Sequence, residues 1–305
     1  MKYRTLGSTG LKVSVVGVGT WQFGGEWDKT FEQTEVDTMF RRAKDLGLNL
    51  VDTAECYGDH LSESLIGAAL QADRADWIIA TKFGHHYHGF MNRTEPRSPD
   101  DVLKQLEDSL RALRTDYVDL LQYHSWGDEQ FFDADVLAAL HRAKDAGKVR
   151  HLGNSVGSNA NVKQITASKD MGIGVIQIIY NRIDRTPENT TFPVCIGQNL
   201  GVLARVPLAS GYLSGKYKPG ATFTPGDVRS KTKQEDLDKK LVEVEKIKRD
   251  EVPPGVNMAE WALAWVLKHP AVSSVIPGCK NVAQVESNAR AAMLDMVDAK
   301  HPQAV

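Results

Sequence analysis

LNLVDTAECYGDH, residues 48–60, joins a buried strand to two reactive side chains. Leu48, Leu50 and Val51 give the apolar start of a strand, and Asp52 stands where that strand should end. Tyr57 follows five residues later, in a loop that contains a glycine. A carboxylate and a phenol are therefore expected at the mouth of one strand.

Seven further apolar runs resemble this one, and longer segments with helical spacing lie between them. The eight runs cover residues 13–19, 49–53, 77–82, 117–124, 149–155, 175–181, 201–206 and 272–277. The segments at 34–47, 99–114, 133–147 and 257–269 have helical spacing, and several begin with Ser, Asp or Asn. Runs that are apolar on both faces predict a parallel sheet covered by helices.

Eight strand-helix units favour an α/β fold of the closed (β/α)8 type, a TIM barrel. The alternative is a doubly wound sheet, which would require G-x-G-x-x-G after its first strand. The stretch GVGTWQFG has Gly17 and Gly19, but Gln22 occupies the third glycine position. Residues 3–14 predict a β-hairpin that turns at residues 8–10 and plugs the lower end of the barrel. We therefore expect one domain over residues 1–305, with a cofactor-loop insertion at about 212–250 that an ordinary solvated loop would also explain.

Composition excludes several classes of protein. The 305 residues carry 37 basic and 39 acidic side chains, a net charge of −2, which argues against nucleic-acid binding. The apolar runs are too short to span a membrane, and the N-terminus lacks the apolar core of a secretory signal. The three cysteines are widely spaced and suit a cytoplasmic protein. The histidines in KFGHHYHGF, residues 82–90, have neither a partner carboxylate nor i, i+4 spacing, so we expect a loop that lines the substrate mouth rather than a metal site.

Four chemically complementary residues fall at the ends of neighbouring predicted strands, where barrel enzymes place their chemistry. Asp52 and Tyr57 follow the second strand, Lys82 ends the third, and His124 ends the fourth. Lys82 would lower the pKa of Tyr57, Asp52 would keep Lys82 charged, and His124 could donate to a substrate oxygen. Each residue taken alone is more often a turn, surface or core residue. Together they suit protonation of a carbonyl oxygen, with the hydride supplied by a cofactor.

Nearly the whole chain resembles the aldo-keto reductase family. The motifs that carry the resemblance are LGSTGLKVSVVGVGTW, VDTAECYGD, ATKFG, DYVDLLQYH, GKVRHLG, PLASGYLSGKY and AWVLKHPAVSSVIPG, in that order. The resemblance implies a (β/α)8 barrel that binds NADP(H) without a Rossmann fold. It also implies that Asp52, Tyr57, Lys82 and His124 are a catalytic tetrad, with Tyr57 as the general acid. It extends to potassium-channel beta subunits.

The resemblance also assigns cofactor-binding residues. They are Thr20, Trp21, Asp52, Ser155, Gln177, Arg205, Pro207, Leu208, Ser210, Gly211, Leu213, Lys216, Gly278, Lys280, Gln284 and Asn288. Lys280 is expected at the 2′-phosphate, beside a helix that begins near Asn281 and whose amides favour an anion. An ordinary capped surface helix is the alternative there. Two positions depart from the family: Val156 replaces an asparagine that holds the nicotinamide, unless Asn154 takes its role, and Arg205 replaces a stacking aromatic.

The expected substrate is a small carbonyl compound held by Trp21, Tyr57, Tyr87, His124 and Trp126, although ordinary packing would also explain the aromatic residues. The first hypothesis is an NADPH-dependent reductase of aldehydes or ketones. A cofactor-binding regulatory subunit is the second, and a sugar or polyol dehydrogenase that runs in the oxidative direction is the third. A homo-oligomer is left open.

Overall fold

The barrel predicted from the eight apolar runs is present. The computed structural model describes residues 1–96, 98–298 and 300–305. Eight strands form one sheet in the order β12-β11-β10-β9-β8-β5-β4-β3, and every adjacent pair is parallel. They are β3 (Val18–Gly19), β4 (Leu50–Asp52), β5 (Ile78–Phe83), β8 (Val118–His124), β9 (Val149–Ser155), β10 (Ile173–Ile179), β11 (Gly201–Arg205) and β12 (Ser274–Val275). Parallel bridges from Val16 to Val275 and from Gly19 to Gly278 join the two ends and close the barrel.

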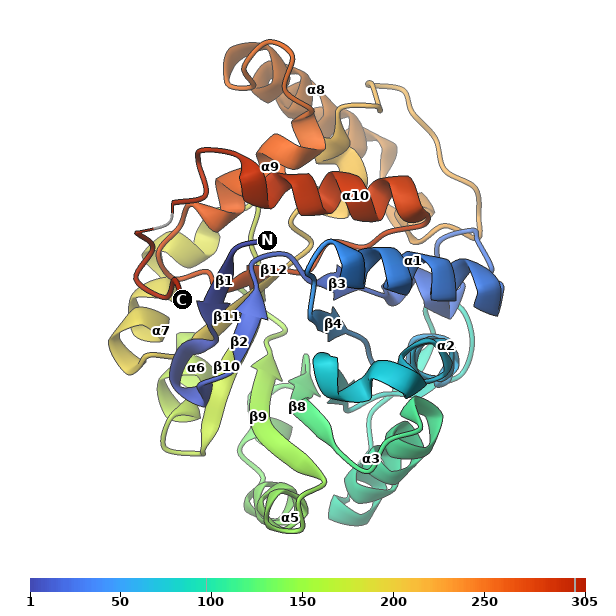
Figure 1. Cartoon of the computed structure of the whole chain (residues 1–305), viewed down its shortest axis with the longest axis vertical. Coiled ribbons are helices and arrows are strands. Elements are labelled where there is room, and N and C mark those ends of the chain that lie inside the picture. Colours follow the sequence, from blue (N-terminus) through green and yellow to red (C-terminus); the bar gives the residue numbers. More distant parts are fainter. Residues whose placement is uncertain (97, 299) are drawn as a thin grey trace.

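Helices surround the strands (Figure 1). They are α1 (Gln33–Asp45), α2 (Leu61–Leu70), α3 (Pro99–Leu113), α4 (Asp128–Phe131), α5 (Ala134–Asp145), α6 (Val162–Ser168), α7 (Phe192–Gln198), α8 (Gln234–Asp250), α9 (Met258–Leu267) and α10 (Val282–Arg290). The polar residues at their starts act as predicted: the side chains of Ser98, Asp133, Asn257 and Asn281 each accept a hydrogen bond from a backbone N–H in the first turn. No described helix has both the length and the apolar character needed to cross a membrane.

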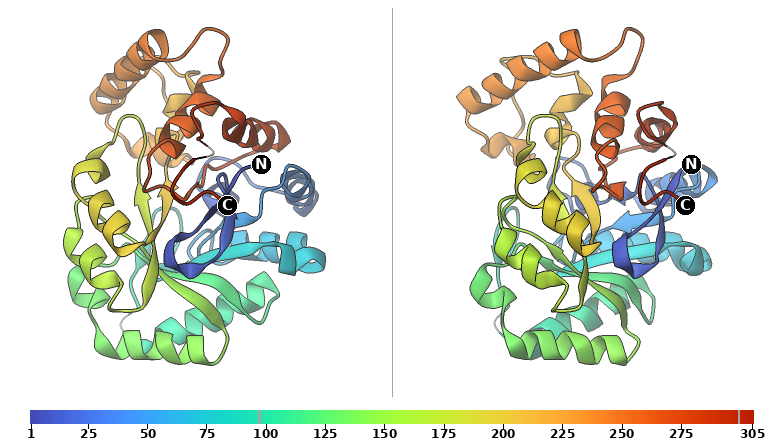
Figure 2. Two further views of the ribbon diagram at one scale, coloured as in Figure 1. Left: turned by 60° about the vertical axis from the view of Figure 1, so that its left-hand side comes forward. Right: turned by 90° about the vertical axis from the view of Figure 1, so that its left-hand side faces the viewer.

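The N-terminal hairpin plugs one end of the barrel. Its arms are β1 (Tyr3–Thr5) and β2 (Lys12–Ser14), joined through the 3-10 turn η1 (Gly7–Thr9). Leu6 and Val13 are fully buried against the apolar side chains inside the barrel, such as Leu50 and Leu203. A Cβ on Gly7 would lie 2.0 Å from the backbone nitrogen of Gly201, so only glycine allows this close approach. The views in Figure 2 show both chain ends on the hairpin side, where the backbones of Arg4 and Ala304 form an antiparallel β-bridge.

The strands expected from the sequence need one correction and one addition. The run at 13–19 is not one strand, because Val13 and Ser14 belong to the hairpin and only Val18–Gly19 enters the barrel. A second small hairpin, β6 (His86–Tyr87) and β7 (Arg93–Thr94), lies in the loop after β5 and was not predicted. Short strands that pair locally carry too few residues to show an apolar alternation.

The insertion after β11 packs as a separate layer over the mouth of the barrel. It contains the 3-10 segments η5 (Ala209–Ser214) and η6 (Val228–Lys231), followed by α8. Leu213 and the buried face of α8 form one apolar cluster with Trp261 of α9. At the far side of the insertion, the backbone of Asp227 forms an antiparallel β-bridge with Trp27, and Thr224 donates a hydrogen bond to Asp28. The insertion therefore crosses the same face of the barrel that carries the predicted catalytic residues.

Candidate active site

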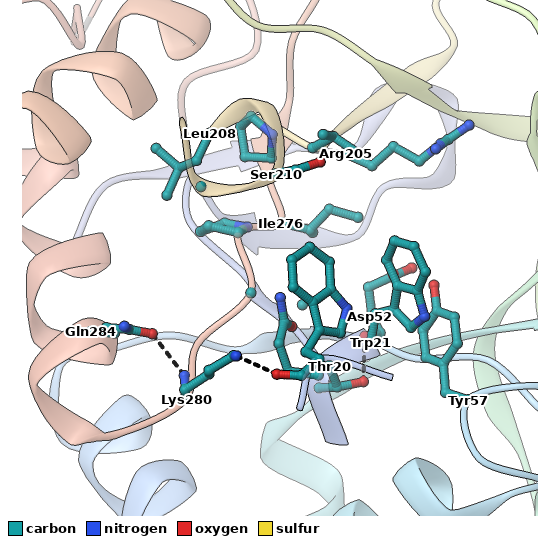
Figure 3. Close-up of a pocket in the computed structure, with 18 of the residues that line it drawn as sticks. Thr20, Trp21, Asp52, Tyr57, Arg205, Leu208, Ser210, Ile276, Lys280 and Gln284 are labelled. Atoms are coloured by element: carbon teal, nitrogen blue, oxygen red, sulfur yellow. Dashed lines mark hydrogen bonds between the residues drawn. The ribbon is translucent and has the colours of Figure 1, made fainter. Parts of the chain in front are cut away.

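A cavity of about 460 Å³ opens at the carboxyl ends of the strands. Figure 3 shows Asp52, Trp21 and Tyr57 at one end of this cavity and Lys280 with Gln284 at the other. Most of the predicted site residues line it: Thr20, Trp21, Asp52, Tyr57, His124, Gln177, Arg205, Pro207, Leu208, Ser210, Gly211, Lys216, Gly278, Lys280, Gln284 and Asn288. The fold thus assembles one site from segments that are more than 200 residues apart.

Lys82 is the centre of a hydrogen-bond cluster below the cavity. Its Nζ donates to Asp52 Oδ2 at 2.8 Å, to the Thr53 carbonyl at 2.7 Å and to the Tyr57 hydroxyl at 3.2 Å. An ammonium can only donate, so the Tyr57 oxygen is the acceptor. The hydroxyl hydrogen of Tyr57 then remains free to donate into the cavity, which is the geometry that a proton donor requires.

The charges in this cluster are fixed by burial and by close partners. Burial opposes the charge on Lys82, but Asp52 and Tyr57 outweigh it and hold the pKa of the ammonium above its usual value. Burial raises the pKa of Tyr57 to about 12, although Lys82 acts in the lowering direction. Lys82 therefore has the expected influence on Tyr57, but the expected net lowering of the pKa is wrong because desolvation is larger. Tyr57 is a neutral phenol at physiological pH.

His124 lies across from Tyr57, with the two ring centroids 6.1 Å apart and nearly perpendicular. Burial lowers the pKa of His124 well below its usual value, and the charges of Lys82, Arg205 and Arg93 lower it further. The ring is therefore neutral, with one nitrogen that can donate and one that can accept. Its Nδ1 faces the Cys56 sulfur at 3.6 Å, which leaves Nε2 for the cavity.

Amide side chains hold Asp52 from the barrel interior. Gln177 Nε2 donates to Asp52 Oδ1 at 2.6 Å, and Gln122 Nε2 donates to the same oxygen at 3.2 Å. Gln122 was not predicted, although it stands two residues before His124 in β8, and strand alternation places both side chains on one face. Ser155 donates to Gln177 Oε1 and lies behind it, outside the cavity lining.

The two departures from the family pattern have structural consequences. Asn154 does not replace the missing asparagine, because its amide donates to Gln164 on the side of the strand opposite Ser155. Arg205 is half-buried at the cavity wall and donates from a terminal nitrogen to the Val156 carbonyl at 3.1 Å. Its Nε is buried and lacks a hydrogen-bond partner among the described residues. Val156 therefore contributes its carbonyl to the site rather than its side chain.

Lys280 lines the end of the cavity that is farthest from Tyr57 (Figure 3), and two further cations of the lining, Lys216 and Arg229, act on its charge. Arg229 is neutralised by Asp227, which accepts from Nε at 2.8 Å and from a terminal nitrogen at 2.6 Å. Lys280 Nζ donates only to the Trp27 carbonyl, at 2.6 Å, and makes no ion pair within the described residues. Burial lowers the pKa of Lys280, as do the charges of Arg229 and Lys216, while Asp227 opposes them. An anion at this end would relieve that repulsion.

The segment from Val206 to Gly211 is held in an uncommon backbone conformation. Val206, Ala209 and Ser210 all have positive φ, at 54°, 47° and 59°, and Gly211 follows at 89°. Such a conformation costs free energy in residues other than glycine and persists where the surrounding structure imposes it, commonly at ligand sites. Of the cavity-lining residues, Gln22, Trp27 and Arg205 each carry a buried polar atom without a partner in the described chain. The cavity thus offers cations, strained backbone and unpaired polar atoms to a large polar ligand.

Five predicted site residues fall outside the lining: Lys82, which lies below it, Trp126, Tyr87, Leu213 and Ser155. Trp126 was expected in the substrate pocket, but it packs on Phe83 and donates to the Gly84 carbonyl at 3.0 Å. The indole is buried in the core, and Ser125 before it has φ 61°. Tyr87 lies in the β6–β7 hairpin and does not line the cavity either. Leu213 and Ser155 lie behind it as supporting residues.

Several lining residues come from loops that gave no sequence signal. They are Gln22, Trp27, Met91, Arg93 and Tyr217. Glu26 organises part of this wall: it is buried, its carboxylate is paired with Arg93, and Oε2 accepts from the Trp21 indole at 2.7 Å. A loop position is set by such tertiary contacts, so its residues show no periodicity that a sequence could reveal.

One cluster in the described residues has the composition of a metal site. The ligand atoms of Glu55, Cys56 and His124 lie within 4.8 Å of one another. Burial raises the pKa of Glu55 to about 8 and raises that of Cys56 above its usual value. Metal binding would require both groups to lose their protons. At neutral pH these three side chains are better suited to hydrogen bonding than to coordination.

Known sequences agree with this geometry. The family model described as "Aldo/keto reductase family" matches residues 15–304. Aldo-keto reductase YhdN of Bacillus subtilis is 29% identical, with 94% of this chain and 87% of that protein covered. A probable voltage-gated potassium channel subunit beta of Arabidopsis thaliana is 30% identical, with 95% and 91% covered. An NADH-specific methylglyoxal reductase of Escherichia coli is 29% identical, with 98% and 96% covered.

Solved structures share the fold as well. The holo form of aldo-keto reductase AKR11C1 from Bacillus halodurans aligns with a TM-score of 0.81 at 30% identity, covering 99% of this chain and 94% of that one. Glycerol dehydrogenase AKR11B4 from Gluconobacter oxydans aligns with a TM-score of 0.81 at 28% identity, covering 99% and 96%. The likeness therefore extends over the barrel, the hairpin and the insertion.

Proposed function

Because this chain belongs to the aldo/keto reductase family, an oxidoreductase family, we propose that it reduces a small aldehyde or ketone with NADP(H), with Tyr57 as the general acid. The observation that carries this proposal is the Lys82–Tyr57 hydrogen bond of 3.2 Å. Lys82 has no acceptor, so it directs the Tyr57 hydrogen away from itself and toward the cavity.

The residues then have separate tasks. The bound cofactor supplies the hydride. Tyr57 gives its proton to the carbonyl oxygen, and Lys82 stabilises the phenolate that this step leaves. Asp52 keeps Lys82 charged and is itself held by Gln177. His124, which is neutral, donates from Nε2 to the carbonyl oxygen as negative charge develops there.

The residues that line the cavity support a nicotinamide dinucleotide as its ligand. Gln177, supported by Ser155, would hold the carboxamide, and the planar guanidinium of Arg205 would contact the ring in place of an aromatic residue. The strained segment Val206–Gly211 would hold the pyrophosphate. Lys280, at the start of α10, would hold the 2′-phosphate. The free charge of Lys280 supports NADP(H) as the cofactor, although the E. coli relative is named as NADH-specific.

Two other functions have support from the comparisons. The 30% identity to a potassium channel subunit favours a regulatory role in which the cofactor binds without rapid turnover. The structural match to a glycerol dehydrogenase favours oxidation of a polyol or sugar by the same tetrad in the reverse direction. The residue that acts as general acid in carbonyl reduction acts as general base in alcohol oxidation, so the same site geometry serves both reactions.

Absorbance at 340 nm tests the three alternatives in one set of assays. NADPH with a panel of aldehydes and ketones tests reduction, and NADP+ with polyols and sugars tests oxidation. We expect the fastest turnover with a carbonyl compound and at least tenfold less with Tyr57→Phe. Tight cofactor binding with no turnover in either direction would contradict the reductase proposal and favour the regulatory one.

A further inference from the structure

Glu55 is a buried carboxyl group that has no task in the proposed chemistry. Its exposed fraction is 2%. Its Oε1 accepts a hydrogen bond from the His85 backbone N–H at 2.8 Å. Its Oε2 is buried, has no hydrogen-bond partner in the described chain, and lies 4.0 Å from Nδ1 of His124. An unpaired buried oxygen costs free energy, so its position behind His124 requires an explanation.

The surroundings decide the protonation of Glu55. Burial raises its pKa to about 8; the His85 N–H and Lys82 oppose this shift, and Glu63 on α2 adds to it. Near neutral pH Glu55 is therefore a carboxylic acid with a hydrogen to donate.

His124 Nδ1 is also approached by Cys56, whose sulfur lies 3.6 Å away. Burial raises the pKa of that thiol, so it too keeps its hydrogen. The other charged groups that act on His124 are Lys82, Arg93 and Arg205, all cations that favour a neutral ring, as does His85. Both neighbours of Nδ1 thus carry a hydrogen that they can donate, which favours a ring that accepts there.

We propose that Glu55 is a positioning residue that holds His124 in the tautomer with its hydrogen on Nε2. This inference rests on the proposed reductase function, because Nε2 is the nitrogen left to donate to the substrate oxygen. A side-chain movement of about 1 Å would bring Oε2 from 4.0 Å into hydrogen-bond range of Nδ1. Cys56 assists from the other side, and a thiol is the weaker donor.

A consequence for pH follows from this arrangement. When Glu55 loses its proton to solvent, its carboxylate can only accept, so it favours the tautomer with hydrogen on Nδ1. The His124 hydrogen then moves from Nε2 to Nδ1, and Nε2 can no longer donate to the carbonyl oxygen. The rate of carbonyl reduction should fall by about tenfold per pH unit above the pKa of Glu55, until the loss of one such donor, about 10²–10³-fold, is complete.

The test is the pH profile of kcat for carbonyl reduction, from pH 6 to 10, in the wild type and in Glu55→Gln. The glutamine carbonyl can accept from His85 while its amide donates to His124 at every pH, so the conservative variant should retain turnover and lose the falling limb near pH 8. Glu235→Gln, an exposed change on α8, is the matched control and should keep the wild-type profile. An identical falling limb in Glu55→Gln would overturn the proposal.

A second measurement does not depend on turnover. The nitrogen-15 chemical shifts of His124, assigned with His124→Asn, report which ring nitrogen carries the hydrogen. We expect hydrogen on Nε2 at pH 7, a change to Nδ1 by pH 9.5, and no change in Glu55→Gln. Hydrogen on Nδ1 at pH 7, or signals altered by dialysis against EDTA, would overturn the proposal, the latter by showing a bound metal. If no carbonyl is reduced but these shifts behave as expected, only the proposed function fails.

Discussion

Replacing Lys280 with alanine should separate NADPH binding from NADH binding. Lys280 is a cation at the far end of the cavity that makes no ion pair within the described chain, since its Nζ donates only to the Trp27 carbonyl. Arg229, beside it, is already paired with Asp227. Lys216 at the same end makes no ion pair with a described residue either, but of the two lysines it is Lys280 that stands at the start of α10. A phosphate that reaches this wall should therefore interact mainly with Lys280.

The magnitude follows from the contacts. A hydrogen bond to a charged group contributes roughly 1.5–3 kcal/mol. Lys280 already bonds to Trp27 and is partly exposed, so we expect the lower half of that range. Each 1.4 kcal/mol is about tenfold in affinity, so Lys280→Ala should weaken NADPH binding by at least tenfold and by less than about a hundredfold. NADH lacks the 2′-phosphate, and its affinity should change little.

Quenching of tryptophan fluorescence is a suitable assay, because Trp21 and Trp27 line the cavity. Both cofactors are titrated into the wild type, Lys280→Ala and the control Lys239→Ala, which removes an exposed lysine from α8. Raising the salt concentration should weaken NADPH more than NADH in the wild type, because salt screens a partly exposed ion pair. Equal weakening of both cofactors by Lys280→Ala would refute the reasoning and make Lys280 a structural residue that supports Trp27.

Four further changes test the site and the fold. Tyr57→Phe should lower the rate of reduction by about 10²–10⁴-fold and leave the cofactor Kd unchanged, and a variant with nearly full activity would remove Tyr57 from the mechanism. Lys82→Met should be comparably inactive. It should also lower the free energy of unfolding by about 3–5 kcal/mol, because it leaves the buried carboxylate of Asp52 unpaired. Denaturant titration of the double variant Lys82→Met/Asp52→Asn should show that part of this loss is recovered. The raised pKa of Glu55, about 8, stabilises the fold at low pH, and this contribution is lost as pH rises through 8. In thermal melts, the Tm of Glu55→Gln relative to that of the wild type should therefore be higher at pH 9 than at pH 6. Asn257→Ala should cost about 1 kcal/mol in urea unfolding by removing the cap of α9, and an unchanged midpoint would show that α9 does not depend on it.

The sequence by itself determined the barrel and the grouping of polar residues at the ends of its strands. Eight apolar runs with helical segments between them predict parallel strands, and parallel strands in a barrel bring their carboxyl ends to one face. Asp52, Lys82 and His124 were therefore placed together by strand register alone, and hydrogen bonds link Lys82 with Asp52 and with Tyr57. Hydrophobic periodicity is a local property that can be seen in the sequence itself, so this part of the structure was predictable.

Only the tertiary structure decided the charges and the walls of the cavity. The pKa of Tyr57 is raised rather than lowered, because desolvation by the whole fold exceeds the effect of one neighbouring lysine. Trp126 packs on Phe83 in the core, and Arg93 reaches the cavity through an unpredicted hairpin. Glu55 lies near His124 only because the loop after β4 reaches past β5 to the end of β8. Desolvation and loop contacts both depend on many residues that are distant in sequence, so no local sequence pattern predicts them.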